Sequence, residues 1–309
     1  MNSIVGPNEL KKIVAKNSNN KNFYIPGERP RGKEEIQDSY GLENLINGKF
    51  GASLHNHTVH SDGAMKVEEI LNQAADYADT HIKQTGEPFY LGITDHNTVE
   101  GCKETVLILA KNPDKYRNLK VVLGSEITVK EDKITGVPLN KPRKLHILVH
   151  SLNPFDKEVN SFINDLTINP KYTEYLKTHN RNTSPFKKNN PMQPKQISLS
   201  FLVDKFKNQK DVKFSFAHPA YPDIKKDIPE EDNHYDAITK IIHFFKKKTK
   251  DKGLYVESHY NSYYGDVAKD IKLHQIIEEA SNQAHLEKAG AIDTHGTNIF
   301  YTGVRSNKK

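Results

Sequence analysis

The sequence predicts an α/β fold with parallel strands, and two observations carry this prediction. Short apolar runs alternate with longer amphipathic segments from residue 51 onward, as in folds built from strand–helix units. Histidine, aspartate and glutamate residues directly follow several of these runs. The carboxyl ends of parallel strands are where such folds gather their functional groups. We therefore expect one dense polar site along one rim of the sheet.

The apolar runs predict five strands, at residues 89–94, 121–124, 145–149, 212–217 and 253–256. Amphipathic segments between them predict helices. In the first of these, apolar residues from Val67 to Ile82 recur at helical spacing. Similar patterns occur near residues 99–110, 198–208, 235–247 and 266–288.

Two regions depart from this alternation. Residues 1–50 are polar and weakly patterned, so we expect an N-terminal extension that wraps the domain or is partly disordered. The main domain is expected at residues 51–305. Within it, the stretch from about 153 to 211 contains five prolines that each follow a polar residue. We interpret that stretch as an inserted subdomain over one face.

Composition excludes several classes of protein. The chain has 309 residues and a mean hydropathy of −0.74, and no run approaches the roughly 20 apolar residues of a membrane span. We therefore expect no membrane association through a span. The beginning of the chain shows no secretory signal pattern. The single cysteine, Cys102, excludes an intramolecular disulfide and a Cys-rich zinc finger. These features together favour a cytoplasmic protein.

The net charge is +6, from 45 basic and 39 acidic residues. A basic balance favours phosphorylated or nucleic-acid ligands. Only six of the basic residues are arginine, however, and arginine is the residue that recognises phosphate in a bidentate manner. We interpret the excess of lysine and asparagine mainly as compositional drift, with a slight preference for nucleotide-like substrates.

The histidines and carboxylates at strand ends predict a metal site. Side chains repeat every two residues along a strand, so His55 and His57 share a face and could bind one ion. Taken singly, such residues have structural explanations: Asp62 could cap a helix, His146 could be a satisfied core histidine, and His218 could mark a turn. Their recurrence in one chain is harder to explain in this way. Imidazole with carboxylate is the ligand mixture preferred by Zn²⁺, Mn²⁺ and Fe²⁺.

Six short motifs make the chain similar to a known family. Residues 54–63 (LHNHTVHSDG) resemble the first motif of the PHP family, the polymerase and histidinol phosphatase domains. Residues 93–98 (ITDHNT) resemble its second motif, and residues 124–127 (GSEI) its glutamate motif. The segments 145–147 (LHI), 217–219 (AHP) and 293–295 (DTH) complete the family order. The resemblance covers residues 52 to about 300 and is nearest to the stand-alone phosphoesterase branch.

This resemblance implies a fold, a cofactor and a set of roles. The fold would be a distorted seven-stranded (β/α) barrel that holds two or three divalent ions (Mn, Zn or Fe). The first ion would be held by His55, His57, Glu126 and Asp293. Glu126 would bridge to a second ion, held also by His146 and His218. A third would be held by Asp62, His96 and His295. Metal-bound hydroxide would be the nucleophile. From their own positions in the sequence, Asp95 and Glu257 could orient the ligands without binding an ion.

The chain departs from the family pattern at two places. Ala291-Ile292 stands where the family often has Gly-Ser, and Ala220 stands where it often has Gly. Neither change removes a ligand, but both alter the expected pocket.

The resulting expectation is a metal-dependent phosphoesterase that acts on a phosphorylated small molecule, a nucleotide or an oligonucleotide. Two alternatives remain open. One is a non-catalytic, metal-stabilised scaffold or regulatory module. The other is a C–N hydrolase of the amidohydrolase type, which prefers a metal-bridging lysine. No serine nucleophile elbow and no phosphate-binding P-loop occurs in the sequence.

Several polar residues near these motifs receive weaker interpretations. We expect His60 not to be a ligand. His150 shares strand parity with His146 and could orient substrate, or could simply end a strand. Lys141, Arg143 and Lys144 could contact substrate phosphate, although a solvated basic loop is the preferred interpretation.

Overall fold

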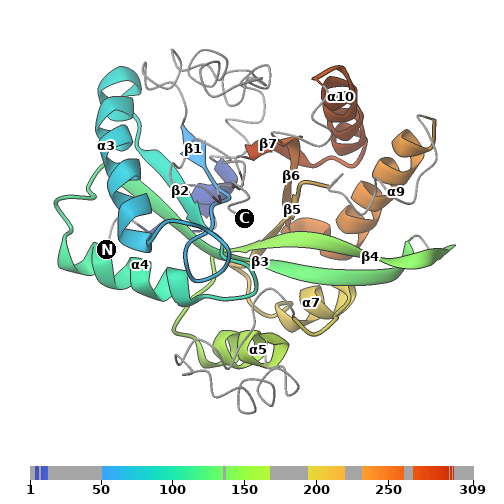
Figure 1. Cartoon of the computed structure of the whole chain (residues 1–309), viewed down its shortest axis with the longest axis horizontal. Coiled ribbons are helices and arrows are strands. Elements are labelled where there is room, and N and C mark those ends of the chain that lie inside the picture. The colour runs from blue at the N-terminus through green and yellow to red at the C-terminus, as the bar shows by residue number, and fades with distance from the viewer. Residues whose placement is uncertain are drawn as a thin grey trace, which may run out of the picture.

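The architecture is a single curled sheet with helices around its outer side (Figure 1). The computed structural model describes residues 4–6, 8–12, 51–134, 137–167, 194–219, 232–260, 267–291, 293 and 295. Seven strands follow one another in chain order in the sheet: β1 (Ala52–Ser53), β2 (Phe89–Ile93), β3 (Leu119–Ile134), β4 (Val137–His150), β5 (Lys213–Ala217), β6 (Gly253–Tyr260) and β7 (Glu287–Ala291).

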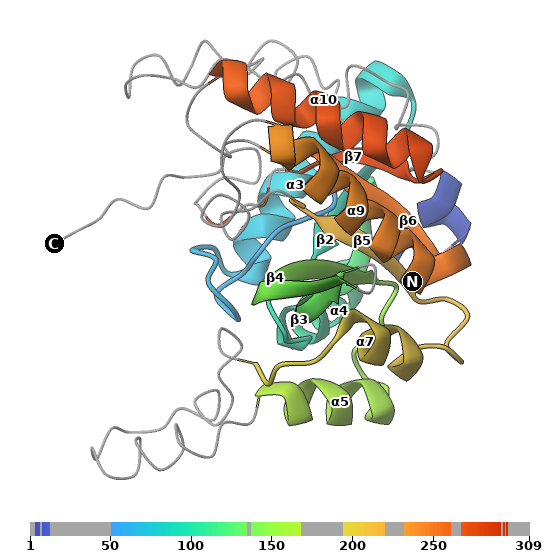
Figure 2. The same cartoon turned by 90° about the vertical axis from the view of Figure 1, so that its right-hand side faces the viewer.

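Helices cover the convex side of this sheet, and the second view separates them into groups. The helices are α3 (Val67–Thr85), α4 (Glu100–Lys111), α5 (Lys157–Thr167), α7 (Leu199–Lys205), α9 (Asp232–Thr249) and α10 (Val267–Gln283), with a 3₁₀ turn, η3, at Lys250–Lys252. In Figure 2, α9 and α10 lie above the strands and α5 and α7 lie below them, so the two groups flank the outside of the curl at different places. The predicted α/β class is confirmed.

Strand direction departs from the prediction in the middle of the sheet. β1, β2 and β3 are parallel, as are β5, β6 and β7. β4 is antiparallel to both β3 and β5, so the expectation of parallel strands throughout is wrong there. Only two residues separate β3 from β4, whereas a parallel crossover needs about a dozen or more. In the part of the chain that the structure describes, β1 does not pair with β7, so the sheet is an open half-barrel.

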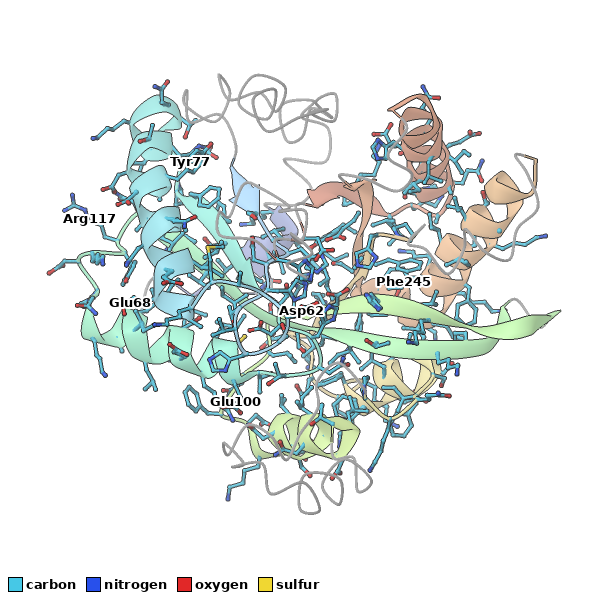
Figure 3. All side chains as sticks on the ribbon, viewed as in Figure 1. Asp62, Glu68, Tyr77, Glu100, Arg117 and Phe245 are labelled. Atoms are coloured by element: carbon cyan, nitrogen blue, oxygen red, sulfur yellow. The ribbon has the colours of Figure 1, made fainter. Side chains whose placement is uncertain are left out.

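Helix α3 shows how the sequence pattern produces these elements. Its buried residues include Val67, Ile70 and Leu71, which recur at the helical period and face the sheet. Glu68 lies exposed in the first turn, where the helix dipole favours acidic side chains. In Figure 3 Tyr77 points from the helix toward β2 while Glu68 lies on the outer side. Gly86 ends the helix at φ 75°, a conformation that glycine adopts without strain.

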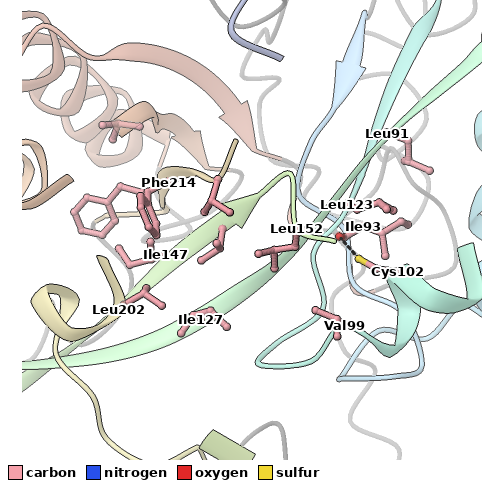
Figure 4. Close-up of a cluster of buried hydrophobic side chains, with 14 of the residues drawn as sticks. Leu91, Ile93, Val99, Cys102, Leu123, Ile127, Ile147, Leu152, Leu202 and Phe214 are labelled. Carbon is pink, nitrogen blue, oxygen red and sulfur yellow. Dashed lines mark hydrogen bonds between the residues drawn. The ribbon is translucent and has the colours of Figure 1, made fainter. Parts of the chain in front are cut away.

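Two hydrophobic cores hold the sheet in place. The larger lies between the sheet and the helices and contains the outward-facing residues of the strands, such as Ile93, Leu123 and Ile147 (Figure 4). Cys102 of α4 is buried in this core and donates from its Sγ to the carbonyl oxygens of Ile93 and Gly124. Burial raises the pKa of its thiol, which therefore has a structural and not a reactive role.

The smaller core fills the inside of the curl and includes residues near the beginning of the chain. Val5 and Leu10 are buried there beside Leu148 and Tyr255. The Val5 amide donates to the carbonyl of Val121 at 2.9 Å, near the beginning of β3. Residues 4–6 and 8–12 therefore pack against the amino-terminal end of the curl. The rest of the predicted 1–50 extension lies outside the described residues.

The described parts of the predicted insertion belong to the main core. Phe162 of α5 and Leu202 of α7 are both buried in the larger cluster. The Lys130 amide donates to the carbonyl of Ile197 at 2.8 Å, which joins this stretch to β3. Residues 168–193 lie outside the described part of the chain, and the boundaries of the predicted insertion and main domain stay predictions.

No helix among the described residues combines the length and apolar character that a bilayer crossing requires.

Candidate metal centre

Most of the predicted ligands follow the carboxyl ends of four strands, β1, β2, β5 and β7, and two more lie within β3 and β4. His55 and His57 follow β1, His96 follows β2, and Glu126 lies in β3 just beyond the end of β2. His218 follows β5, and the last two predicted ligands follow β7. All of them lie at one rim of the curl, where Asp62 marks the position in Figure 3. β4 supplies His146 to the same rim, because its antiparallel register places this residue opposite Thr128.

Four buried side chains bring their donor atoms together within hydrogen-bond range. His55 Nε2 lies 3.0 Å from His57 Nε2 and 2.9 Å from Glu126 Oε2. His57 Nε2 lies 3.0 Å from Glu126 Oε2 and 3.0 Å from Asp293 Oδ1. An ion with tetrahedral bonds of about 2.0–2.1 Å separates its ligand atoms by about 3.3 Å. The spacing of this group fits such an ion.

A second group surrounds the opposite edge of the His57 ring. Asp62 Oδ1 lies 3.2 Å from His295 Nε2, 3.8 Å from His96 Nε2 and 4.0 Å from His57 Nδ1. The His57 ring stacks on those of His96 and His295, with centroids 4.4 Å apart in both cases. His57 therefore turns one ring nitrogen to each group, and these four residues could hold a metal ion.

Glu126 joins the first group to a third. Its Oε1 lies 2.7 Å from His146 Nδ1 and 3.1 Å from His218 Nε2, and its Oε2 lies 3.3 Å from His96 Nδ1. His96, Glu126 and His146 could hold an ion, since their donor atoms lie within 4.8 Å of one another. His218 contacts the same carboxylate but is not part of that group. The sequence predicted His218, and not His96, as a ligand of the second ion. In the structure, His96 lies close enough to both the second and the third group to be a ligand in either.

Two buried carboxylates, Glu257 and Asp95, lie next to these groups without belonging to them. Glu257 Oε1 lies 2.9 Å from His55 Nδ1, and its Oε2 accepts from the His218 amide at 2.9 Å. Asp95 accepts from the amide and the hydroxyl of Thr58, at 2.6 and 2.8 Å, and from the Ser61 hydroxyl at 2.8 Å. Both carboxylates therefore lie where an orienting role is expected, beside ligands and not among them.

The sequence interpretation missed the residues that support these carboxylates. Thr58 and Ser61 hold Asp95, and their positions inside the first motif are the signal that could have identified them. Asn56 is buried and donates to the carbonyls of Ser53 and Gly92, which joins β1 to β2. Strand parity predicts that Asn56 points away from the face of His55 and His57.

Backbone conformation also places the ligands. His218 and Asp293 have φ of 25° and 50°, in the left-handed region that non-glycine residues rarely adopt. Such conformations persist where the surroundings impose them, and they are common at functional sites. The Ala64 amide donates to the carbonyl of His295 at 3.0 Å, so the loop that carries Asp62 is tied to the end of β7.

The short contacts between histidines and carboxylates shift the pKa values of the predicted ligands. Burial opposes ionisation of Glu126 and Asp293, but the surrounding histidines hold the pKa of both carboxyl groups well below the usual range. Burial favours the neutral form of His57, yet its hydrogen bonds to Asp293 and Glu126 raise its pKa to about 10. Burial lowers the pKa of His96 to about 3. The carboxylates are therefore charged at neutral pH, as metal ligands must be.

The ligands differ in their exposure to solvent. His55, His57 and Glu126 are at most 1% exposed, whereas Asp62, His146 and His295 are 14–23% exposed. An incoming molecule would reach the centre from the side of the more exposed residues.

Three other predicted residues lie outside the groups. His60 Nε2 lies 2.6 Å from Glu104 Oε2 and belongs to none of the three groups, in line with the expectation that it is not a ligand. His150 is fully buried inside the curl, where its Nε2 lies 3.1 Å from Ser215 Oγ. Lys144 lies within β4, so the predicted basic loop is wrong at this position. The strand extends there because it pairs with β3 beyond the rim.

The comparisons with known proteins add little beyond the geometry. No family model matches the chain, and no curated protein matches it. Among solved structures, it is similar to a protein from Bifidobacterium adolescentis provisionally described as a metal-dependent phosphoesterase. That structure shares 16% identity over 80% of this chain and 88% of its own, with a TM-score of 0.47. At this level, the likeness does not establish membership of the PHP family or a shared activity.

Proposed function

We propose that this chain is a metal-dependent hydrolase of phosphate esters with a centre of two or three divalent ions. The observation that carries the proposal is the overlap of three potential metal groups through shared ligands. His57 belongs to two groups, His96 to two and Glu126 to two. Shared ligands of this kind hold ions close together, which is the arrangement of enzymes that cleave phosphate esters.

The proposed ligands follow the three groups. The first ion is assigned to His55, His57, Glu126 and Asp293; the second to Glu126, His146 and His218, with His96 close by; the third to Asp62, His96 and His295, with His57 close by. The donor set contains imidazole nitrogens and carboxylate oxygens and no thiolate. This set favours Mn²⁺, Zn²⁺ or Fe²⁺.

Divalent ions bound there would lower the pKa of a water molecule and neutralise charge on the phosphate oxygens. The residues of the chain have their own tasks. Glu257 and Asp95 keep the ligands in fixed orientations, which avoids reorganisation during the reaction. The more exposed side, formed by Asp62, His146 and His295, receives the phosphate group. The leaving group then faces solvent, where it can be released.

The C–N hydrolase alternative is less well supported by the site. Enzymes of that type prefer a metal-bridging lysine on a barrel strand. Lys213 is a buried lysine of the described sheet and begins β5, whereas His218 follows the other end of that strand. Burial and the nearby ammonium groups of Lys11 and Lys252 lower the pKa of Lys213, which lies at the amino-terminal end of the curl. The scaffold alternative does not explain why partly exposed ligands remain at the rim.

The experiment uses chelator-treated protein to which Mn²⁺, Zn²⁺ or Fe²⁺ is added back. The substrates are a phosphomonoester, a nucleoside 3′,5′-bisphosphate, a 5′-phosphorylated oligonucleotide and an amide. Metal-dependent cleavage of any phosphate ester supports the proposal. The preferred substrate then shows whether the enzyme acts on simple monoesters, nucleotides or oligonucleotides. Absence of cleavage of every phosphate ester with every ion would refute it, and amide cleavage would favour the C–N hydrolase.

A further inference from the structure

The β3–β4 hairpin continues past the metal centre and forms a wall beside it. In its register Glu126 lies opposite Leu148 and Thr128 lies opposite His146. The next pair of this series is Lys130 opposite Lys144. β3 then extends to Ile134, well beyond the end of β2. This hairpin is the long green pair of strands that projects from the sheet in Figure 1.

The two lysines lie on the same face of the hairpin as the metal ligands. Directly opposed residues of an antiparallel pair share a face, and so do residues two apart. Burial agrees with this assignment. Ile127, Val129 and Glu131 are buried, whereas Thr128 and Lys130 are half-buried.

The opposite face of the hairpin is covered by another segment. The Leu199 amide at the beginning of α7 donates to the Glu131 carboxylate. On the face that carries the two lysines, Lys144 is exposed and Lys130 is half-buried among the described residues.

Placing two lysines directly opposite each other does not help the hairpin to fold. Like charges directly opposite each other destabilise a strand pair. Neither Lys130 nor Lys144 forms an ion pair or a side-chain hydrogen bond with any residue of the described segments. Within the described part of the chain, the pair therefore presents two positive charges that no carboxylate neutralises.

The lysine pair lies next to the more exposed side of the metal centre along β4. Lys144 precedes His146 by two residues, which is about 7 Å along a strand. His146 is 20% exposed and lies at the side from which a phosphate group would enter. A lysine side chain in this position reaches a phosphate group one sugar away from the group at the metals.

We propose that Lys130 and Lys144 form a subsite for a second phosphate group of the substrate. The subsite would favour substrates with two phosphates on one nucleoside, or with neighbouring phosphates along a single strand, over simple phosphomonoesters. This inference rests on the proposed function for the identity of the first phosphate. The lysine pair itself can be tested by binding alone.

The test compares the full-length, metal-loaded protein with two double variants. In K130Q/K144Q both hairpin charges are removed. In K83Q/K111Q two exposed lysines at the ends of α3 and α4 are replaced, with the same loss of charge far from the hairpin. The binding probe is a fluorescent, 5′-phosphorylated phosphorothioate oligonucleotide, which keeps the backbone charge and resists cleavage. A nucleoside 3′,5′-bisphosphate serves as a competitor.

We expect K130Q/K144Q to bind the oligonucleotide about tenfold more weakly than the wild type, from two exposed charge contacts. Its affinity should also depend less steeply on salt concentration. K83Q/K111Q should bind like the wild type. If the bisphosphate loses competing strength in K130Q/K144Q as well, two phosphates on one nucleoside suffice. If only the oligonucleotide is affected, the subsite requires a strand.

Equal affinities of the two double variants for both ligands would overturn the proposal. Activity provides an independent arm. For an active enzyme, K130Q/K144Q should raise KM for the bisphosphate or the oligonucleotide and leave kcat/KM for a simple phosphomonoester unchanged. Absence of activity in all proteins would refute the proposed function, while the binding comparison would still decide on the subsite.

Discussion

The Glu257 carboxylate lies 2.9 Å from His55 Nδ1, on the side of the ring opposite the metal centre. This contact turns His55 Nε2 toward His57 and Glu126. A ring nitrogen that faces a carboxylate carries the proton, so the other nitrogen is left free to bind an ion. The second oxygen of Glu257 accepts from the His218 amide, so one carboxylate positions two predicted ligands.

Glu257→Gln should weaken metal binding by about 10–100-fold, because an amide cannot accept on both sides. One of the two contacts would be lost, either to the His55 ring or to the His218 amide. The metal affinity can be measured by competition with a chromophoric chelator. Glu158→Gln, an exposed change on α5, is the control and should match the wild type. Unchanged affinity in Glu257→Gln would show that Glu257 does not position the ligands.

Gly101→Ala should destabilise the protein by about 1–3 kcal/mol, although alanine normally favours a helix. A Cβ at this position would lie 2.1 Å from Asp95 Oδ2 and 3.1 Å from Thr58 Oγ1. Urea unfolding measures the effect. In an Asp95→Ala background the clashing atom is absent, so the penalty of Gly101→Ala should shrink. An equal loss of stability in both backgrounds would show that a clash with Asp95 is not the cause.

Metal binding should release more than one proton per chain at pH 7.5. His57 has a pKa of about 10 in the absence of ions, because Asp293 and Glu126 stabilise its charged form against the effect of burial. Carboxylate contacts likewise raise the pKa of His55 and His218 despite burial. These imidazoles must lose their protons in order to bind an ion, so affinity should increase with pH. Titration calorimetry in two buffers of different ionisation enthalpy counts the protons, and a count of zero would contradict this balance.

His150 should make the metal-free protein sensitive to acid. Burial lowers the pKa of its imidazole from 6.5 to about 3 in the folded state. The unfolded chain therefore binds a proton first as the pH falls. The resulting stability is complete above pH 6.5 and decreases between pH 6.5 and about 3. The loss amounts to about 2 kcal/mol by pH 5.

This effect can be measured by urea unfolding of chelator-treated protein at pH 7 and pH 5. The stability of His150→Gln should fall by about 2 kcal/mol less than that of the wild type over this interval. Its amide can still contact Ser215 Oγ, which lies 3.1 Å from His150 Nε2 in the wild type. Parallel decreases in the two proteins would show that His150 is not held in its neutral form.

Local patterns predicted which polar side chains follow the ends of strands. The period of two placed His55 and His57 on one face, and the apolar runs located the ends of β2 and β5 near His96 and His218. These features depend only on neighbouring residues. The parity of Lys130, Lys144 and His146 could also be read from the sequence once their strands are known.

Long-range contacts account for what the sequence did not reveal. The pairing of β3 with β4 beyond the rim depends on two strands whose ends are polar, so apolar runs marked only their middle parts. The sharing of His57 between two groups depends on which ring nitrogen faces which carboxylate. Spacing along the chain does not determine that orientation. The burial of Val5 and Leu10 inside the curl likewise requires contacts with residues more than 100 positions away.

The most direct test of the central claim is to measure phosphate-ester turnover and metal content together in His57→Ala and His243→Ala. His57 belongs to two of the potential metal groups, whereas His243 is an exposed histidine on α9. The account predicts that His243→Ala retains both metal and turnover, and that His57→Ala loses bound metal and nearly all turnover while remaining folded. Undiminished turnover in His57→Ala would contradict it.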